Sequence, residues 1–250
     1  MKCITGMFGW LGGKRLLTKA IVAEMPAHKC YVEVCAGAAS VFFRKEPSDA
    51  EVINDINKEL ITCYRVVQNH FNELCRYISD MLVSRDEFIR FRAMPPETLT
   101  DIQKAARFLY LLKCHNPTYG YSKTGRPKFN PDALAEHIKI AHKRLKRVNI
   151  ECLPYGDVIK RYDTPDTLFY VDPPYYNMED YYGKGIFSKD DFTKLKQLLT
   201  SINGKFIMSI NDVPEIRELF KPFRIREVAT SYSVNSEGSQ KVGELLIMNY

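Results

Sequence analysis

A short stretch from Leu168 to Asn177, LFYVDPPYYN, combines residue types that could do chemistry. Its first half is an apolar run typical of a buried parallel strand, and Asp172 stands where that strand should end. Two prolines then restrict the backbone and remove two N–H donors, and Tyr175 follows. The stretch therefore predicts a carboxylate and an aromatic ring held in fixed places at the carboxyl end of a strand. The simpler interpretation is a strand end with a Pro-Pro turn and two surface tyrosines.

Elements that could position these residues alternate near both ends of the chain. The hydrophobic pattern predicts helices over 39–45 and 189–199 and further strands over 30–36, 51–57, 147–153 and 205–211. This alternation is typical of an α/β fold, a Rossmann-like and mostly parallel sheet with helices on both faces. The last two strands have no helix between them, so we expect an antiparallel hairpin at the sheet edge.

The middle of the chain is helical and basic. Helices are expected from Lys58 to about Arg92, over 101–115 and over 132–146. Between residues 101 and 147, eleven Lys or Arg stand against three Asp or Glu, a balance of +8 that exceeds the +6 of the whole chain. Such a segment is either a solvated helical face or a polyanion-binding surface. We interpret residues 66–147 as an insertion into one sheet domain made of 1–65 and 148–250.

Composition excludes several classes of protein. With 250 residues, 45% of them hydrophobic and 26% charged, the chain is an ordinary globular one. No apolar run is long enough for a membrane span, and glycines break the N-terminal stretch before a signal-like region develops, so we expect a cytoplasmic protein with no membrane partner. Seven irregularly spaced cysteines favour neither a disulfide framework nor a zinc ribbon, and no metal site is expected.

Two small-residue turns suggest a bound ligand. After the first strand, Gly37 and its alanine neighbours would let a ligand approach the backbone, with Glu33 beside it, although tight packing explains such a turn equally well. Asp55 ends the second strand, where dinucleotide-binding folds hold ribose hydroxyls. Near the N-terminus, GWLGGKR lacks the final Ser or Thr of a nucleotide-binding P-loop, so Lys14 is expected to bring its charge to a carboxylate instead.

Taken in order, the motifs resemble those of one enzyme family. FGWLGGK, YVEVCAGAAS, INDINKELI, the basic middle, LFYVDPPYY and ELLIMNY are similar to the Dam-type (D12 class) DNA adenine-N6 methyltransferases, over nearly the whole chain. The resemblance implies a class I methyltransferase fold, S-adenosylmethionine as methyl donor and a flipped adenine in double-stranded DNA as acceptor. It makes the helical insertion a target-recognition region and leaves open a restriction endonuclease as partner. Where the family usually has F-x-G-x-G, this chain has Cys35, Gly37 and Ala39.

The resemblance also assigns residues, position by position. It implies a catalytic set of Asp172, Pro173, Pro174 and Tyr175. It implies cofactor contacts by Trp10, Lys14, Glu33, Cys35, Ala36, Gly37, Asp55, Asp157 and Val158, the last two in a polar turn after the strand NIECL. The DNA contacts are expected in the basic loop of the insertion, at Tyr119, Tyr121, Lys123, Arg126 and Lys128.

The chemistry of methylation suits these residues. The exocyclic amine of adenine is a poor nucleophile because its lone pair is delocalised into the ring. Asp172 could accept one N–H of that amine and the rigid carbonyl of Pro173 the other, which would stabilise positive charge as the methyl arrives. Tyr175 would stack on the flipped base, and no metal is needed.

Other functions fit parts of the pattern. The same geometry could methylate N4 of cytosine or a base in RNA, and a non-catalytic DNA-binding protein could keep the fold. The intact Asp172 to Tyr175 set argues against the latter. A protein-glutamine methyltransferase is disfavoured because that family resembles N-P-P-Y at this place and needs no basic insertion.

Overall fold

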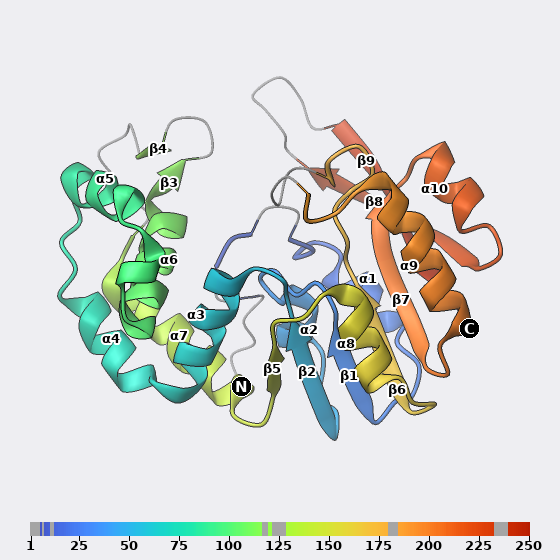
Figure 1. Ribbon diagram of the computed structural model, residues 1–250, viewed down its shortest axis with the longest axis horizontal. Helices are drawn as coiled ribbons and strands as arrows, with labels where there is room; N and C mark the ends of the chain where they lie inside the picture. Colours follow the sequence, from blue (N-terminus) through green and yellow to red (C-terminus); the bar gives the residue numbers. More distant parts are fainter. Residues whose placement is uncertain are drawn as a thin grey trace.

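A computed structural model gives the arrangement of the chain. It describes residues 6, 8–10, 13–116, 120–121, 129–179, 185–232 and 240–250. They form a sheet with helices on both faces and a group of helices beside the β5 edge of that sheet (Figure 1). Within these ranges, no helix has both the length and the apolar character that crossing a membrane requires.

Seven strands make up the sheet, in the spatial order β5-β2-β1-β6-β7-β9-β8. Their bounds are β1 Cys30–Glu33, β2 Ala50–Asn54, β5 Asn149–Glu151, β6 Thr167–Val171, β7 Lys205–Asn211, β8 Arg224–Tyr232 and β9 Gln240–Met248. The first five in this order run parallel, whereas β9 lies antiparallel between β7 and β8. The predicted α/β sheet and its antiparallel edge hairpin are therefore confirmed.

Both faces of the sheet are buried, as the unbroken apolar run of β6 predicts. Because side chains alternate along a strand, Leu168 and Tyr170 belong to one core while Phe169 and Val171 belong to the other. The first core contains buried residues of α1 Thr18–Ala23, α2 Ser40–Arg44 and α3 Lys58–Asn69. The second contains those of α8 Tyr155–Tyr162, α9 Lys189–Ser201 and α10 Pro214–Leu219.

The helical group beside the sheet consists of α4 Phe71–Ser79, α5 Arg85–Ala93, α6 Asp101–Cys114 and α7 Pro131–Leu145, with a 3-10 turn at Pro96–Thr98 and the short pair β3 His115–Asn116 and β4 Gly120–Tyr121. The helix expected from Lys58 to about Arg92 is in fact three helices. His70 leaves helical geometry between the first two. Ser84, whose hydroxyl accepts from Glu87 N at 3.0 Å, starts the third.

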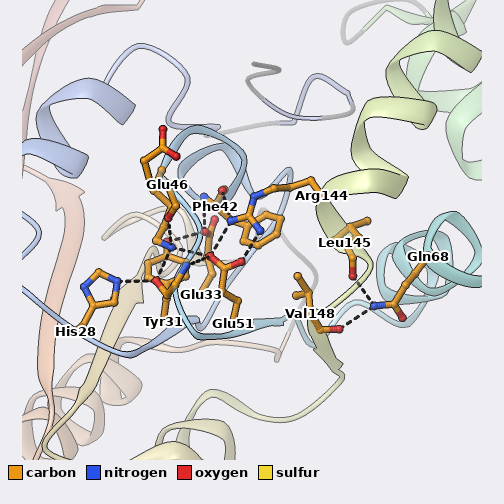
Figure 2. A network of polar contacts seen from close by, with 12 residues as sticks. His28, Tyr31, Glu33, Phe42, Glu46, Glu51, Gln68, Arg144, Leu145 and Val148 are labelled. Carbon is orange, nitrogen blue, oxygen red and sulfur yellow. Dashed lines mark hydrogen bonds and ion pairs between the residues drawn. The ribbon is translucent and has the colours of Figure 1, made fainter. Parts of the chain in front are cut away.

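A buried ionic group joins this helical part to the sheet (Figure 2). The guanidinium of Arg144, on α7, pairs with both carboxylate oxygens of Glu51 on β2 and donates to Phe42 O at 3.2 Å. Lys45 Nζ binds the same carboxylate at 2.6 Å. Burial raises the pKa of Glu51, but the hydrogen bonds from Arg144 and Lys45 outweigh that effect and hold it below its ordinary value. Part of the positive charge counted in the insertion therefore serves the fold.

Candidate active site

A cavity of about 590 Å³ opens at the carboxyl ends of β1, β2 and β6. This is where the strand order reverses, because β1 pairs with β2 on one side and with β6 on the other. Asp172 and Pro174 line the cavity. Seven of the residues expected to bind the cofactor also line it, namely Trp10, Lys14, Glu33, Cys35, Ala36, Gly37 and Asp55.

The turn after β1 is held tightly around Gly37. Its φ of +48° is one that side-chain-bearing residues rarely adopt, and a Cβ added there would lie 2.7 Å from Trp10 Cδ1. Tyr64 donates its hydroxyl to Gly37 O at 2.7 Å, and Gly37 N donates to Asp55 Oδ2 at 2.9 Å. Ala39 also has a positive φ, of 51°, at the position where the family pattern has glycine. The indole and the glycine backbone thus form one wall of the cavity.

Asp55 lies at the end of β2, as predicted. Its second oxygen, Oδ1, accepts from Asn57 N at 2.9 Å. Burial raises the pKa of this carboxyl group, although the backbone N–H groups of Asn57 and Gly37 oppose the shift. The preceding Asn54 was not predicted as part of the site, yet its amide bonds to Val34 O at 2.8 Å and Leu153 O at 3.0 Å. It ties together the ends of β1, β2 and β5.

Asp157 and Val158 do not line the cavity. The polar turn expected at residues 154–158 is the start of α8, which follows Pro154. Helical periodicity turns Val158 into the core of the sheet and leaves Asp157 exposed. The cavity is lined instead by Leu153, Pro154 and Tyr155, just ahead of them.

Asp172 follows β6 and is held by two partners. Its Oδ1 lies 2.8 Å from Lys14 Nζ and accepts the hydroxyl of Ser209, on β7, at 3.0 Å. The side chain is 19% exposed. Burial raises the pKa of Asp172, while the charge and hydrogen bond of Lys14 and the hydroxyl of Ser209 lower it, and the net shift is upward. Sequence reasoning assigned Lys14 to the cofactor, whereas the structure also pairs it with the expected catalytic carboxylate.

Tyr175 and Glu244 complete this ionic group. The Tyr175 hydroxyl donates to Glu244 Oε2 at 2.6 Å and lies 3.2 Å from Lys14 Nζ. Lys14 is 3% exposed and Glu244 is fully buried. Ser209 and Glu244 were not predicted as site residues. Their one signal in the sequence is a polar residue within or directly before an apolar run, FIMSI for Ser209 and ELLIM for Glu244.

The chain leaves Asp172 along a fixed path. Pro173 is buried, and neither it nor Tyr175 lines the cavity. Directly after Tyr175, the backbone N–H of Tyr176 donates to Asn211 Oδ1 at 2.9 Å, and Asn211 Nδ2 donates back to Tyr176 O at 3.2 Å. The end of β7 thereby holds the backbone that carries the expected catalytic residues.

Glu33 is buried at the end of β1 (Figure 2). Its Oε2 accepts from Tyr31 Oη at 2.7 Å and from Phe42 N at 2.8 Å. Burial raises the pKa of this carboxyl group to about 8, since these hydrogen bonds only partly offset the loss of hydration. The group is therefore largely protonated at neutral pH.

Because the pKa of Glu33 is raised in the folded protein, the free energy of unfolding should fall as the pH rises. The folded protein keeps the Glu33 proton that the unfolded chain releases near pH 4.5, so the free energy of unfolding should fall between about pH 4.5 and 8. The slope is at most about 1.4 kcal/mol per pH unit. Glu33→Gln, which is always neutral, should flatten this dependence and be the more stable protein at pH 8. Urea unfolding across this range measures it, and parallel curves for the two proteins would contradict it.

The expected DNA contacts lie mostly beyond the described residues. Tyr119, Lys123, Arg126 and Lys128 fall outside them, and Tyr121 is described only by its backbone, which pairs with His115 across the short β3-β4 pair. Among the residues that the structure does describe, no three His, Cys, Asp or Glu side chains are grouped so that they could hold a metal ion. The expectation that the reaction needs no metal stays a prediction.

Residues 10–234 match the family model of the D12 class N6 adenine-specific DNA methyltransferases. The chain belongs to this family. Among known members, the type II methyltransferase M.MjaIII of Methanocaldococcus jannaschii is 27% identical over 96% of this chain and 97% of its own length. The DNA adenine methylase of Escherichia coli K12 is 25% identical over 99% and 96%.

Membership decides the class of reaction. This family member is a DNA methyltransferase specific for N6 of adenine, with S-adenosylmethionine as methyl donor. The resemblance read from the sequence motifs is thereby confirmed. The roles of individual residues are a separate matter and rest on the geometry described above.

Proposed function

We propose that the cavity is the S-adenosylmethionine site and that Asp172, Pro173 and Tyr175 hold a flipped adenine at its end. One observation carries this proposal. Asp172, which follows β6, and the Gly37 turn, which follows the neighbouring β1, line the same cavity. A methyl donor held by the turn would therefore meet an amine held by the carboxylate.

The lining residues fit this cofactor. Asp55 accepts backbone N–H groups at both oxygens, and its carboxylate still has a lone pair for a ribose hydroxyl. Gly37 and Trp10 pack against each other in the cavity wall, and the apolar side chains of Ile56 and Leu153 suit a planar base. When bound, S-adenosylmethionine supplies an electrophilic methyl group on a cationic sulfur. Asp157 and Val158, which the resemblance assigns to the cofactor, give way in this proposal to Leu153 and Tyr155.

The residues beside the cavity would act on the adenine amine. Asp172 accepts one of its N–H groups and the Pro173 carbonyl the other, so electron density gathers on nitrogen and the positive charge that develops there is stabilised. Lys14 and Ser209 hold the carboxylate in place, and the pairing of Tyr176 with Asn211 holds the backbone. Pro174 would close the site beside the base, and Tyr175 would stack on it.

Residues 66–147 serve as the target-recognition region in this account, beside a catalytic domain of 1–65 and 148–250. The substrate is double-stranded DNA, in which one adenine is turned out of the helix. The basic loop carrying Tyr119, Tyr121, Lys123, Arg126 and Lys128 would contact phosphates and a groove. Binding should therefore weaken steeply as salt is added. A restriction endonuclease as partner remains a prediction from the family resemblance.

Trp10 allows a direct test of the cofactor site, because it is the single tryptophan of the chain and lines the cavity. Adding S-adenosylmethionine should change the tryptophan fluorescence saturably, and calorimetry should give the same affinity. Trp10→Phe should abolish the optical signal and weaken calorimetric binding. ATP is the control ligand and should give neither response. If S-adenosylmethionine produces no saturable binding by either method, the cavity is not its site.

A further inference from the structure

Glu244 is an acidic residue at a place where a neutral residue could make the same hydrogen bond. It lies on β9 directly before the apolar run LLIM, fully buried, and Tyr175 donates a hydroxyl to its Oε2 at 2.6 Å. Its Oε1 lies 3.1 Å from Lys14 Nζ, although it has no hydrogen-bond partner among the described residues. A neutral glutamine could accept the same tyrosine hydroxyl without the cost of burying a charge.

Lys14 already has a partner of opposite charge in Asp172, at 2.8 Å. Burial alone lowers the pKa of Lys14, but the two carboxylates raise it well above its ordinary value, so the amine is firmly protonated. Burial raises the pKa of Glu244, while the charge of Lys14 and the hydrogen bond from Tyr175 oppose that shift. One ammonium group thus lies between two acidic side chains. The nearby Glu33 adds little charge at neutral pH because its pKa is about 8.

We propose that Glu244 is a positioning residue that leaves one net negative charge on the group of Lys14, Asp172 and Glu244, and that this charge favours cationic S-adenosylmethionine over neutral S-adenosylhomocysteine. The inference rests on the proposed cofactor site. Because Lys14 and Asp172 line the cavity, a net negative charge on the group would attract the sulfonium ion of a cofactor bound there. Glu244 acts through Lys14 and Tyr175 and does not itself line the cavity.

Such a charge would favour turnover as well as binding. In the transfer the S–CH₃ bond breaks with its electron pair left on sulfur, the N6 lone pair forms the new N–C bond, and the amine then loses one proton to water. The sulfur is neutral afterwards, so the attraction that held the donor is gone. The spent cofactor is therefore released more readily than the donor.

The affinities of the two ligands, measured by calorimetry without DNA, test this proposal, since no turnover then occurs. In Glu244→Gln the preference for S-adenosylmethionine over S-adenosylhomocysteine should fall about tenfold. Glu244→Met should give the same fall, because it also removes the charge, although it loses the hydrogen bond to Tyr175. Glu244→Asp keeps the charge and should stay within about twofold of the unchanged protein. Thermal unfolding of each variant confirms that the protein compared is folded.

Glu151→Gln is the matched control. Glu151 also accepts a tyrosine hydroxyl, from Tyr162 at 2.7 Å, and pairs with Arg161 at 3.3 Å, but it does not line the cavity. The preference of the Glu151→Gln protein for S-adenosylmethionine over S-adenosylhomocysteine should not change. The proposal would be overturned if Glu244→Gln and Glu244→Met kept the preference of the unchanged protein, whether the two affinities stayed the same or fell equally. If the unchanged protein bound neither ligand, the proposed cofactor site itself would be wrong.

Discussion

Asp172→Asn should lower the rate of methyl transfer by a factor of about 10³ or more. The carboxylate is aimed into the cavity by Lys14 at 2.8 Å and Ser209 at 3.0 Å, so its negative charge faces the place where the adenine amine becomes positive. An amide in the same position keeps the shape but loses that charge. Asp172→Ala should abolish methylation and leave DNA binding largely intact. Single-turnover transfer of labelled methyl measures the rate, and fluorescence anisotropy measures DNA binding.

Ser209→Ala is the control for this experiment, since it removes a donor to Asp172 and leaves the carboxylate. The rate should then fall by about tenfold or less. Loss of DNA binding in parallel with activity would point to misfolding of either variant. If Asp172→Asn kept a rate within about tenfold of the unchanged protein, Asp172 would not be the group that activates the amine.

Gly37→Ala should weaken cofactor binding by at least about 100-fold and destabilise the fold by about 2 kcal/mol. The new Cβ would lie 2.7 Å from the Trp10 ring, and the φ of +48° is strained for any residue with a side chain. Either the indole moves into the cavity or the turn moves away from Asp55. Calorimetry with S-adenosylmethionine and urea unfolding measure the two effects.

Gly156→Ala is the matched substitution. The nearest atom to its new Cβ is Leu198 Cδ2, at 4.0 Å, and the site lies in the first turn of α8. There alanine should leave cofactor affinity unchanged and stabilise the helix by up to about 1 kcal/mol. Equal effects of the two substitutions on cofactor affinity would show that the Gly37 turn has no special place in the site.

Local pattern was enough to predict the frame of the site. The apolar run of β6 and the prolines after it set Asp172 at a strand end, and the strand that ends near Asp55 has an equally clear pattern. Each of these signals lies within a few residues of the position that it predicts. They depend on backbone restriction and on alternate burial, which a single sequence displays.

Contacts between distant segments were not predictable in the same way. Lys14 meets Asp172 and Glu244 only because β6, β7 and β9 are neighbours in the sheet, and the sequence does not show that pairing. Asp157 and Val158, which the resemblance assigns to the cofactor, do not line the cavity, and the reason is local. Pro154 starts a helix there, and the turn that the resemblance implied is absorbed into α8.

The most direct test of the account is transfer of labelled methyl from S-adenosylmethionine to unmethylated double-stranded DNA, followed by nucleoside analysis of the product. We expect label in N6-methyladenine, and its loss with Asp172→Asn. Label in N4-methylcytosine would contradict the assigned acceptor. Unlabelled DNA, from a protein that binds S-adenosylmethionine by calorimetry, would contradict the account as a whole.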